Sequence, residues 1–241
     1  MMCSTGIPLP FAIVADLRTG STLLSSSLNK HPQICCRGEL LHPNDLPDNQ
    51  LSRVRRHDLN ASELLQAAFD VACVRAAGFR AMIFRPDPQE QPQWAAFWDR
   101  LAIWKSLRVL FLKRRDPLAQ YASLCIAQQT GQFHPAAGDP ILSAEHRPRL
   151  QIDPDAFRTW AEQRHQLRSH RKAQLQGVPI LDLSYEELVS QWDFTMQQIQ
   201  RFLGVDIRPL AQAKQKQEQR PLRSVIRNYE QVRGIADHLP T

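Results

Sequence analysis

The chain has 241 residues, of which 43% are hydrophobic, so it can bury one substantial core and we expect a single domain over residues 1–241. This composition excludes collagen-like and disordered chains, and no run of about eighteen apolar residues predicts a transmembrane helix. The net charge of +6 and the pI near 9.3 favour an anionic partner. Since the basic residues are spread along the chain without a recognisable nucleic-acid module, we expect no nucleic-acid partner.

Cysteine usage and the first residues suggest a compartment. The five cysteines are Cys3, Cys35, Cys36, Cys73 and Cys125. Their number is odd, two are adjacent and none form a C-x-x-C spacing, so we expect neither a disulfide framework nor a zinc site. Residues 1–10 carry no basic segment followed by a long apolar stretch. We therefore expect a soluble protein in a reducing compartment, the cytoplasm, and a homodimer is an open alternative to a monomer.

The chain begins with a strand, a turn and a helix. Residues 11–15 form a short apolar run that stops at a polar turn, and Leu23, Leu24 and Leu28 then recur at helical spacing. Further apolar runs predict strands over 79–84, 109–112 and 180–183. Capping residues and helical periodicity predict helices over 60–78, 94–104, 116–131, 153–177, 184–188, 192–203 and 222–232.

Four buried strands that alternate with helices predict the fold class. Such a pattern is typical of a mostly parallel central sheet covered on both faces, a three-layer α/β/α architecture. Its ligand site lies outside the carboxyl ends of the strands. The segment 132–151 is rich in Pro, Gly and His and lacks periodicity, so we expect a loop that covers the substrate.

The turn after the first strand predicts a phosphate or sulfate site. Gly20 allows the backbone to bend closely around an anion, and the next helix directs free N–H groups and a positive dipole there. An ATP-binding P-loop would need G-x-x-x-x-G-K-[ST], whereas residues 15–22 lack its first glycine and its lysine. ATP hydrolysis is therefore disfavoured.

Residues 18–24, Arg-Thr-Gly-Ser-Thr-Leu-Leu, resemble the 5′-phosphosulfate loop of the sulfotransferase family. A second element of that family is an arginine at a strand end, a proline two residues on and a serine eight residues on, and Arg115, Pro117 and Ser123 match it. A guanidinium can fork onto two phosphate oxygens while the serine hydroxyl adds a donor two helical turns away. Alone, the arginine could be a common strand-end charge and the serine a small helix residue. Both family elements occur here, however, and in the same order along the chain as in the family.

The resemblance implies a P-loop-NTPase-like sulfotransferase fold that binds 3′-phosphoadenosine 5′-phosphosulfate (PAPS), without a metal, and releases adenosine 3′,5′-bisphosphate (PAP). Around Arg220 the tail, residues 205–241, resembles bacterial and carbohydrate-type members and is expected to complete the donor site. The acceptor would be a carbohydrate, a glycolipid or another small metabolite. The implied donor-binding residues are Arg18, Thr19, Gly20, Ser21, Thr22, Leu23, Arg115, Ser123 and Arg220.

Acceptor activation needs a base close to the transferred group. Glu39 matches the glutamate base of several carbohydrate-type sulfotransferases, although it could equally be a surface acid of a loop. His42 is the second candidate base, and His31 or His134 could contact the acceptor. Arg18 would stabilise the charge that develops on the leaving phosphate.

Two other functions are compatible with parts of the sequence. A P-loop kinase or NTPase with a degenerate phosphate loop would use the same turn, although the missing Gly-Lys pair argues against it. A polyanion or nucleic-acid binder would explain the charge and would bind with steep salt dependence. A sulfotransferase explains both the loop and the strand-end arginine.

Overall fold

The computed structural model describes residues 7–40, 61–83, 91–133, 149–213 and 220–240. The strands are β1 (Leu9–Ala15), β2 (Ile34–Glu39), β3 (Ala76–Met82), β4 (Arg108–Lys113) and β5 (Ile180–Ser184). The helices are α1 (Ser21–Leu28), α3 (Ala61–Phe69), α4 (Gln91–Ala102), α5 (Pro117–Thr130), α6 (Pro154–Gln174), α7 (Tyr185–Ser190), α8 (Trp192–Leu203), α9 (Leu222–Val225) and α10 (Tyr229–Ala236).

The strands form one parallel sheet in the order β2-β3-β1-β4-β5. Ala15 at the end of β1 lies opposite Met82 of β3 and Leu112 of β4, so three strands end at the same level. The chain leaves β1 toward β2 on one side and leaves β4 toward β5 on the other. This reversal between β1 and β4 is the topological switch point at which open α/β sheets bind ligands.

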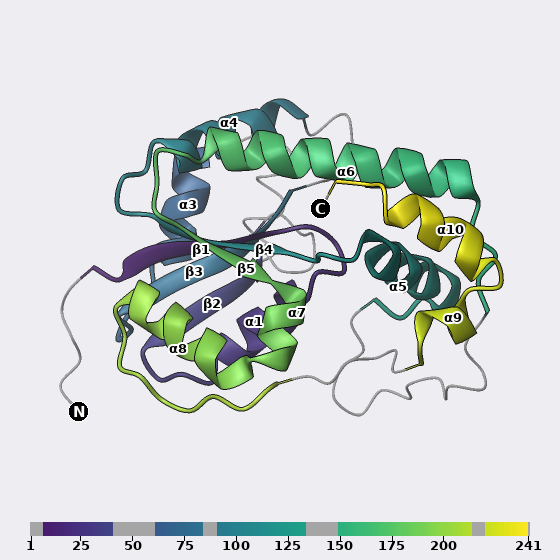
Figure 1. Ribbon diagram of the computed structural model, residues 1–241. Coiled ribbons are helices and arrows are strands. Elements are labelled where there is room, and N and C mark those ends of the chain that lie inside the picture. Colours follow the sequence, from purple (N-terminus) through teal and green to yellow (C-terminus); the bar gives the residue numbers. More distant parts are fainter. Residues whose placement is uncertain (1–6, 41–60, 84–90, 134–148, 214–219, 241) are drawn as a thin grey trace.

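Helices cover both faces of the sheet, which confirms the expected three-layer α/β/α fold (Figure 1). On one face, α3, α4 and α6 pack on Ala12, Val14 and Phe79. On the other face, α1, α7 and α8 pack on Phe11 and Ile13. Neighbouring β1 residues alternate between the two clusters because successive strand side chains point to opposite faces.

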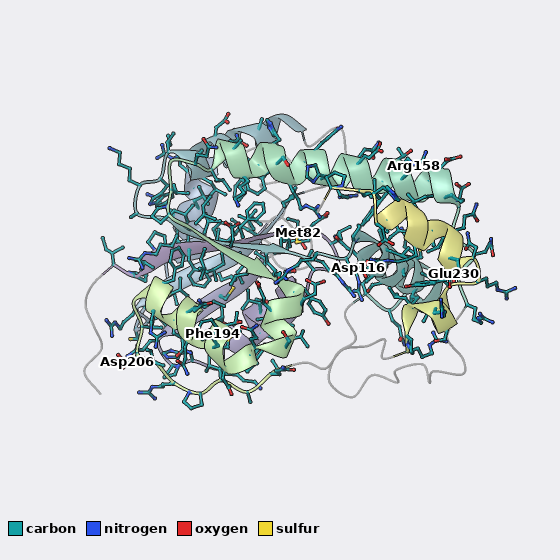
Figure 2. The ribbon with its side chains drawn as sticks, viewed as in Figure 1. Met82, Asp116, Arg158, Phe194, Asp206 and Glu230 are labelled. Carbon is teal, nitrogen blue, oxygen red and sulfur yellow. The ribbon has the colours of Figure 1, made fainter. Side chains whose placement is uncertain are left out.

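A third apolar cluster lies beyond the ends of the strands. It joins α5, the N-terminal half of α6 and the tail helices α9 and α10, which Figure 1 shows together at one end of the molecule. Leu150 forms a parallel bridge with Ile226, and Arg233 of α10 binds Asp116 at 3.0 Å. Figure 2 shows Asp116 between the sheet and this helical group. The tail is therefore attached to the start of α5.

The predicted caps of α5, α6, α7 and α8 are confirmed. Asp116 and Asp153 cap α5 and α6 through hydrogen bonds to backbone N–H groups, and Ser184 caps α7. Gly131 and Gly204 end α5 and α8 in the left-handed conformation. Each cap satisfies backbone groups that a helix end leaves without an intrahelical partner.

Two predicted boundaries are wrong. The helix expected over 60–78 ends at Phe69, and Gly78, expected to stop it, lies inside β3. A Cβ on Gly78 would come within 2.5 Å of the Phe11 carbonyl oxygen, so the glycine permits close approach of two strands. Ala76 and Ala77, directly before Gly78, are completely buried in β3, where the sheet centre favours small side chains.

The sheet also contains one strand more than predicted. The strand β2 has the sequence Ile-Cys-Cys-Arg-Gly-Glu, in which only Ile34 and Cys36 are buried. It is the edge strand and pairs with β3 alone among the described strands, and its remaining side chains are partly exposed. An edge strand needs no continuous apolar run, and this one therefore lacked the expected signal.

The expectation about disulfides is wrong for one cysteine. Cys73 is disulfide-bonded, whereas Cys35, Cys36 and Cys125 are free. Disulfide formation depends on two Cβ atoms meeting in space, which spacing along the chain does not show. Burial raises the pKa of the Cys36 thiol to about 12. The cytoplasm as compartment stays a prediction.

Candidate active site

The turn between β1 and α1, residues 16–20, is called the phosphate loop below. Arg18 has a φ of 62° and Gly20 a φ of 88°, so two of its residues are left-handed. A Cβ on Gly20 would lie 2.7 Å from the ring of Tyr185. Gly20 is therefore needed both for the backbone conformation and for the packing of that ring.

Helix α1 begins directly after Gly20 with the features of an anion site. Its N-cap residue, Gly20, has no side chain that could cap it, and its first turn contains no acidic residue. The N-terminus of an α-helix presents unpaired N–H groups and the positive end of its dipole. Gly20, Ser21, Thr22 and Leu23 lie at this helix start, and their role as an anion cradle stays a prediction.

Arg18 extends from the phosphate loop to α5 and the segment after it. Its Nε donates to Ser123 Oγ at 3.1 Å, and its Nη1 donates to the Phe133 carbonyl at 2.6 Å. Burial, and then the charge of Arg114, lower the pKa of Arg18. The structure thus brings together two residues that the sequence assigned to different halves of the donor site.

Arg115 has other partners. Its guanidinium donates to Ser184 Oγ at 2.9 Å and forms an ion pair with Glu187, while its backbone N–H donates to the Glu186 carboxylate at 3.1 Å. Arg115 and Ser123, expected to hold one phosphate together, therefore have separate partners. The assignment of Arg115 to the donor stays a prediction.

Arg114 is the strand-end guanidinium that faces the phosphate loop. Its Nη1 donates to the Arg18 carbonyl at 3.3 Å, and its Cζ lies 4.7 Å from the centre of the Tyr185 ring. Burial lowers the pKa of Arg114. Its Nε is buried with no hydrogen-bond partner among the described residues. No local sequence pattern distinguishes Arg114 from its neighbour Arg115.

Glu39 lies at the carboxyl end of β2, on the same edge of the sheet as the phosphate loop. The strand register places it opposite Arg80 of β3, and Arg80 Nη1 donates to Thr22 Oγ1 at 2.7 Å. Thr22 belongs to the first turn of α1. Glu39 is half-buried, and so is not a freely solvated loop acid. His42 and His134 lie outside the described residues.

A buried carboxylate that the sequence did not identify anchors the phosphate loop. Asp16 accepts from the Leu17 N–H at 2.7 Å and forms an ion pair with Arg164 of α6 at 3.2 Å. Burial raises the pKa of Asp16, and Arg164 and the Leu17 hydrogen bond oppose that rise. Arg164 and Arg168 stand on the apolar side of α6, and charges at such positions are a signal of a buried ion pair.

His31 is a structural residue. It is buried, its Nε2 lies 2.8 Å from the Asp206 carbonyl oxygen, and its Nδ1 accepts from the Gln33 N–H. Figure 2 shows Asp206 at the lower left of the view, away from Asp116. The idea that His31 contacts the acceptor is therefore wrong. Arg220 lies two residues before α9, and its contact with the donor stays a prediction.

The residues around the phosphate loop fit an anionic ligand. Arg18, Arg114 and Arg115 follow β1 and β4 at the switch point, and an uncapped helix N-terminus adds partial positive charge. The charge of Arg114 helps to lower the pKa of Arg18, so an anion that binds near both guanidinium groups would oppose that shift. Phosphate groups have the charge and the acceptor oxygens that this arrangement needs.

Comparison with known proteins identifies the family. The sequence profile of the sulfotransferase family matches residues 10–209. The chain belongs to this family. Nodulation protein H of Rhizobium tropici is 28% identical over 238 residues, which cover 97% of this chain and 91% of that protein. Nodulation protein H of Rhizobium meliloti (strain 1021) is also 28% identical, over 97% of this chain and 93% of that protein.

A solved structure shares the fold of this sulfotransferase. The sulfotransferase domain of the Synechococcus PCC 7002 olefin synthase superposes with a TM-score of 0.50 and 15% sequence identity, over 98% of this chain and 88% of that one. The predicted P-loop-like α/β fold is thereby confirmed.

The family confirms the predicted enzyme class, a sulfotransferase with PAPS as donor, and does not favour the kinase alternative. None of the described helices is long and apolar enough to cross a membrane. Among the described residues, no group of three or more His, Cys, Asp or Glu side chains could hold a metal ion.

Proposed function

We propose that this sulfotransferase moves the sulfuryl group of PAPS onto a hydroxyl of a carbohydrate, a glycolipid or another small metabolite. The observation that carries the proposal is the uncapped N-terminus of α1 beside Arg18 and Arg114, at the switch point between β1 and β4. The similarity of the tail around Arg220 to bacterial and carbohydrate-type enzymes supports the acceptor class.

The two ends of the donor would bind to different elements. The N–H groups of Gly20, Ser21, Thr22 and Leu23, with Arg18 and Thr19, would hold the 5′-phosphosulfate at the start of α1. Arg115 and Ser123 would hold the 3′-phosphate, for which Arg115 would exchange or share its contact with Glu187. Arg220 would approach from the tail. This division explains why the site requires both β1 and β4.

The chemistry would be a direct transfer between two oxygen atoms. The acceptor oxygen attacks sulfur, the bond from sulfur to the 5′-phosphate oxygen breaks, and PAP departs with the electron pair. Glu39 takes the hydroxyl proton, and Arg18 with the loop N–H groups stabilises the charge that develops on the leaving phosphate. His42 is the alternative base. We propose no metal in this reaction.

Transfer of labelled sulfate tests the proposal. The purified protein is incubated with ³⁵S-labelled PAPS and separate oligosaccharide, glycolipid and small-metabolite fractions, and labelled products are separated by chromatography. We expect label in at least one hydroxyl-bearing fraction and release of an equal amount of PAP. Release of free sulfate alone from every fraction would contradict an acceptor of these classes.

Three further expectations belong to the same proposal. Residues 132–151 would cover the acceptor, although 134–148 lie outside the described residues. The tail would complete the donor site through the contact of Arg233 with Asp116, which links α10 to α5. A homodimer and a cytoplasmic location are predictions that light scattering and cell fractionation would check.

A further inference from the structure

Three successive carbonyl groups of the phosphate loop accept hydrogen bonds from side chains. The Asp16 carbonyl accepts from Thr19 Oγ1 at 2.8 Å. The Leu17 carbonyl accepts from Gln120 Nε2 at 2.7 Å. The Arg18 carbonyl accepts from Arg114 Nη1 at 3.3 Å. Because a trans peptide directs its C=O and N–H oppositely, these bonds fix the direction of the Arg18 and Thr19 N–H groups.

Gln120 makes the shortest of these three contacts and does so from the protein interior. Its side chain is completely buried on α5. The same Nε2 also lies 3.4 Å from Asp16 Oδ2, so one amide group serves both the backbone and the anchoring carboxylate of the loop. Gln120 therefore lies where the Asp16–Arg164 ion pair meets the phosphate loop.

Only one orientation of the Gln120 amide suits these neighbours. A flipped amide would direct Oε1 at the Leu17 carbonyl and at the Asp16 carboxylate, which are acceptors only. In the observed orientation Oε1 is buried and has no hydrogen-bond partner among the described residues. Packing alone would be satisfied by an apolar side chain of the same length, so the two N–H contacts are the distinguishing feature of a glutamine here.

Gln120 and Ser123 both belong to α5, the helix that carries part of the proposed 3′-phosphate site. Ser123, one turn further along α5, accepts from Arg18 Nε at 3.1 Å. Residues three apart on a helix lie on one face, so α5 holds the phosphate loop at two points. Since α5 starts next to Arg115, these contacts link the loop to the strand end that would bind the second phosphate.

We propose that Gln120 is a positioning residue that holds the phosphate loop in its anion-binding conformation. Arg18 has a left-handed backbone, which is unfavourable for a side chain of its kind and persists only under outside constraint. Without the Gln120 contact, the peptide between Leu17 and Arg18 can rotate, and the loop that leads to the N–H groups of Gly20, Ser21, Thr22 and Leu23 loses its conformation. That the bound anion belongs to PAPS or PAP rests on the proposed function.

Gln120→Met tests the proposal, because methionine has a similar length and cannot donate. Hydrogen–deuterium exchange of residues 16–24 is measured without nucleotide, and PAP affinity by calorimetry. We expect faster exchange in the loop and about tenfold weaker PAP binding, the effect of one typical hydrogen bond. At saturating PAPS, kcat should fall as well, because the loop N–H groups that Gln120 positions also stabilise the charge on the leaving phosphate. Gln128→Met, an exposed position of the same helix, is the control and should change neither quantity.

The outcomes separate the inference from the function on which it rests. Wild-type exchange and wild-type PAP affinity in Gln120→Met would overturn the inference. A lower unfolding midpoint with unchanged loop exchange would overturn it too, since Gln120 would then serve packing. If wild-type protein does not bind PAP, the proposed donor site fails, whereas exchange still decides the role of Gln120. Should the methionine variant not fold, Gln120→Asn, whose shorter amide withdraws from Leu17, is judged by the same criteria.

Discussion

Glu39 and Arg80 occupy opposing positions on neighbouring strands, and Arg80 binds the first turn of α1 through Thr22. This chain of contacts joins the candidate base to the helix that would hold the donor. A base must lie near the acceptor hydroxyl, and the acceptor oxygen must in turn face the sulfur. The position of Glu39 at the loop edge of the sheet is consistent with that role.

Glu39→Gln isolates the role of the base. The amide has nearly the same shape but cannot accept the proton, so we expect kcat to fall by about 10²- to 10⁴-fold, the usual worth of a general base. PAP affinity should change by less than about twofold, because a transition-state contact is lost and a ground-state contact is kept. Steady-state kinetics and calorimetry on the same preparations measure both effects.

A matched variant at His42 distinguishes the two candidate bases. If His42→Asn lowers kcat by the factor expected for Glu39→Gln, while Glu39→Gln keeps the wild-type kcat, the base is His42. Such a result would leave the donor site intact and would contradict only the assignment of Glu39.

Part of the site could be predicted from single residues, and part could not. The Arg18 to Leu23 loop and the spacing of Arg115 to Ser123 are local patterns, and the structure places both elements at one edge of the sheet. Asp16, Gln120 and Arg164 come from three distant segments, and their hydrogen bonds exist only after the chain folds. No local pattern encodes which of two adjacent arginines turns toward the loop.

At the scale of elements, strand interiors and helix ends could be predicted from the sequence because each depends on a local pattern of residues. Apolar runs marked β1, β4 and β5, and side-chain caps marked α5, α6 and α7. The edge strand β2 and the start of β3 could not be predicted in this way. Their residues are small or polar, and whether they form a strand depends on the neighbouring strands.

Gly78→Ala tests the close approach of β3 to β1. The added Cβ would meet the Phe11 carbonyl oxygen and ring at 2.5 to 2.6 Å, so backbone or ring must move. We expect the free energy of unfolding to fall by about 1–3 kcal/mol, the usual cost of overpacking a core. Urea unfolding followed by circular dichroism measures it.

Gly234→Ala is the matched control for that measurement. Gly234 lies within α10, and an added Cβ there would have no neighbour within 4 Å. Alanine in an exposed helix is more favourable than glycine by about 0.5–1 kcal/mol. The control should therefore gain stability, and a loss of stability in Gly234→Ala with none in Gly78→Ala would contradict the packing argument.

For the whole molecule, alternation of strands and helices was sufficient to predict the sheet, its two covered faces and the edge that carries the site. It was not sufficient to predict the third cluster, in which α5, α6 and the tail helices pack beyond the strand ends. That cluster depends on contacts between residues far apart in the chain, such as Leu150 with Ile226 and Asp116 with Arg233. It connects the tail to α5, the helix proposed to bind the donor.

The central claim is that one site holds a nucleotide at two separate phosphates, one beside Arg18 and one beside Arg115. PAP has a 3′-phosphate, which ATP lacks, whereas a kinase or NTPase would prefer ATP. A charge-assisted contact contributes about 1.5–3 kcal/mol, which corresponds to roughly 10- to 150-fold in affinity. The preference for PAP should therefore depend on Arg115.

Calorimetric titration of wild-type protein and Arg115→Ala with PAP and with ATP tests this claim most directly. We predict that wild-type protein binds PAP at least about tenfold more tightly than ATP. The variant should lose most of that preference through weaker PAP binding, with ATP affinity unchanged. ATP binding as tight as PAP binding in wild-type protein, or an Arg115→Ala variant that keeps the full preference, would contradict the two-phosphate site.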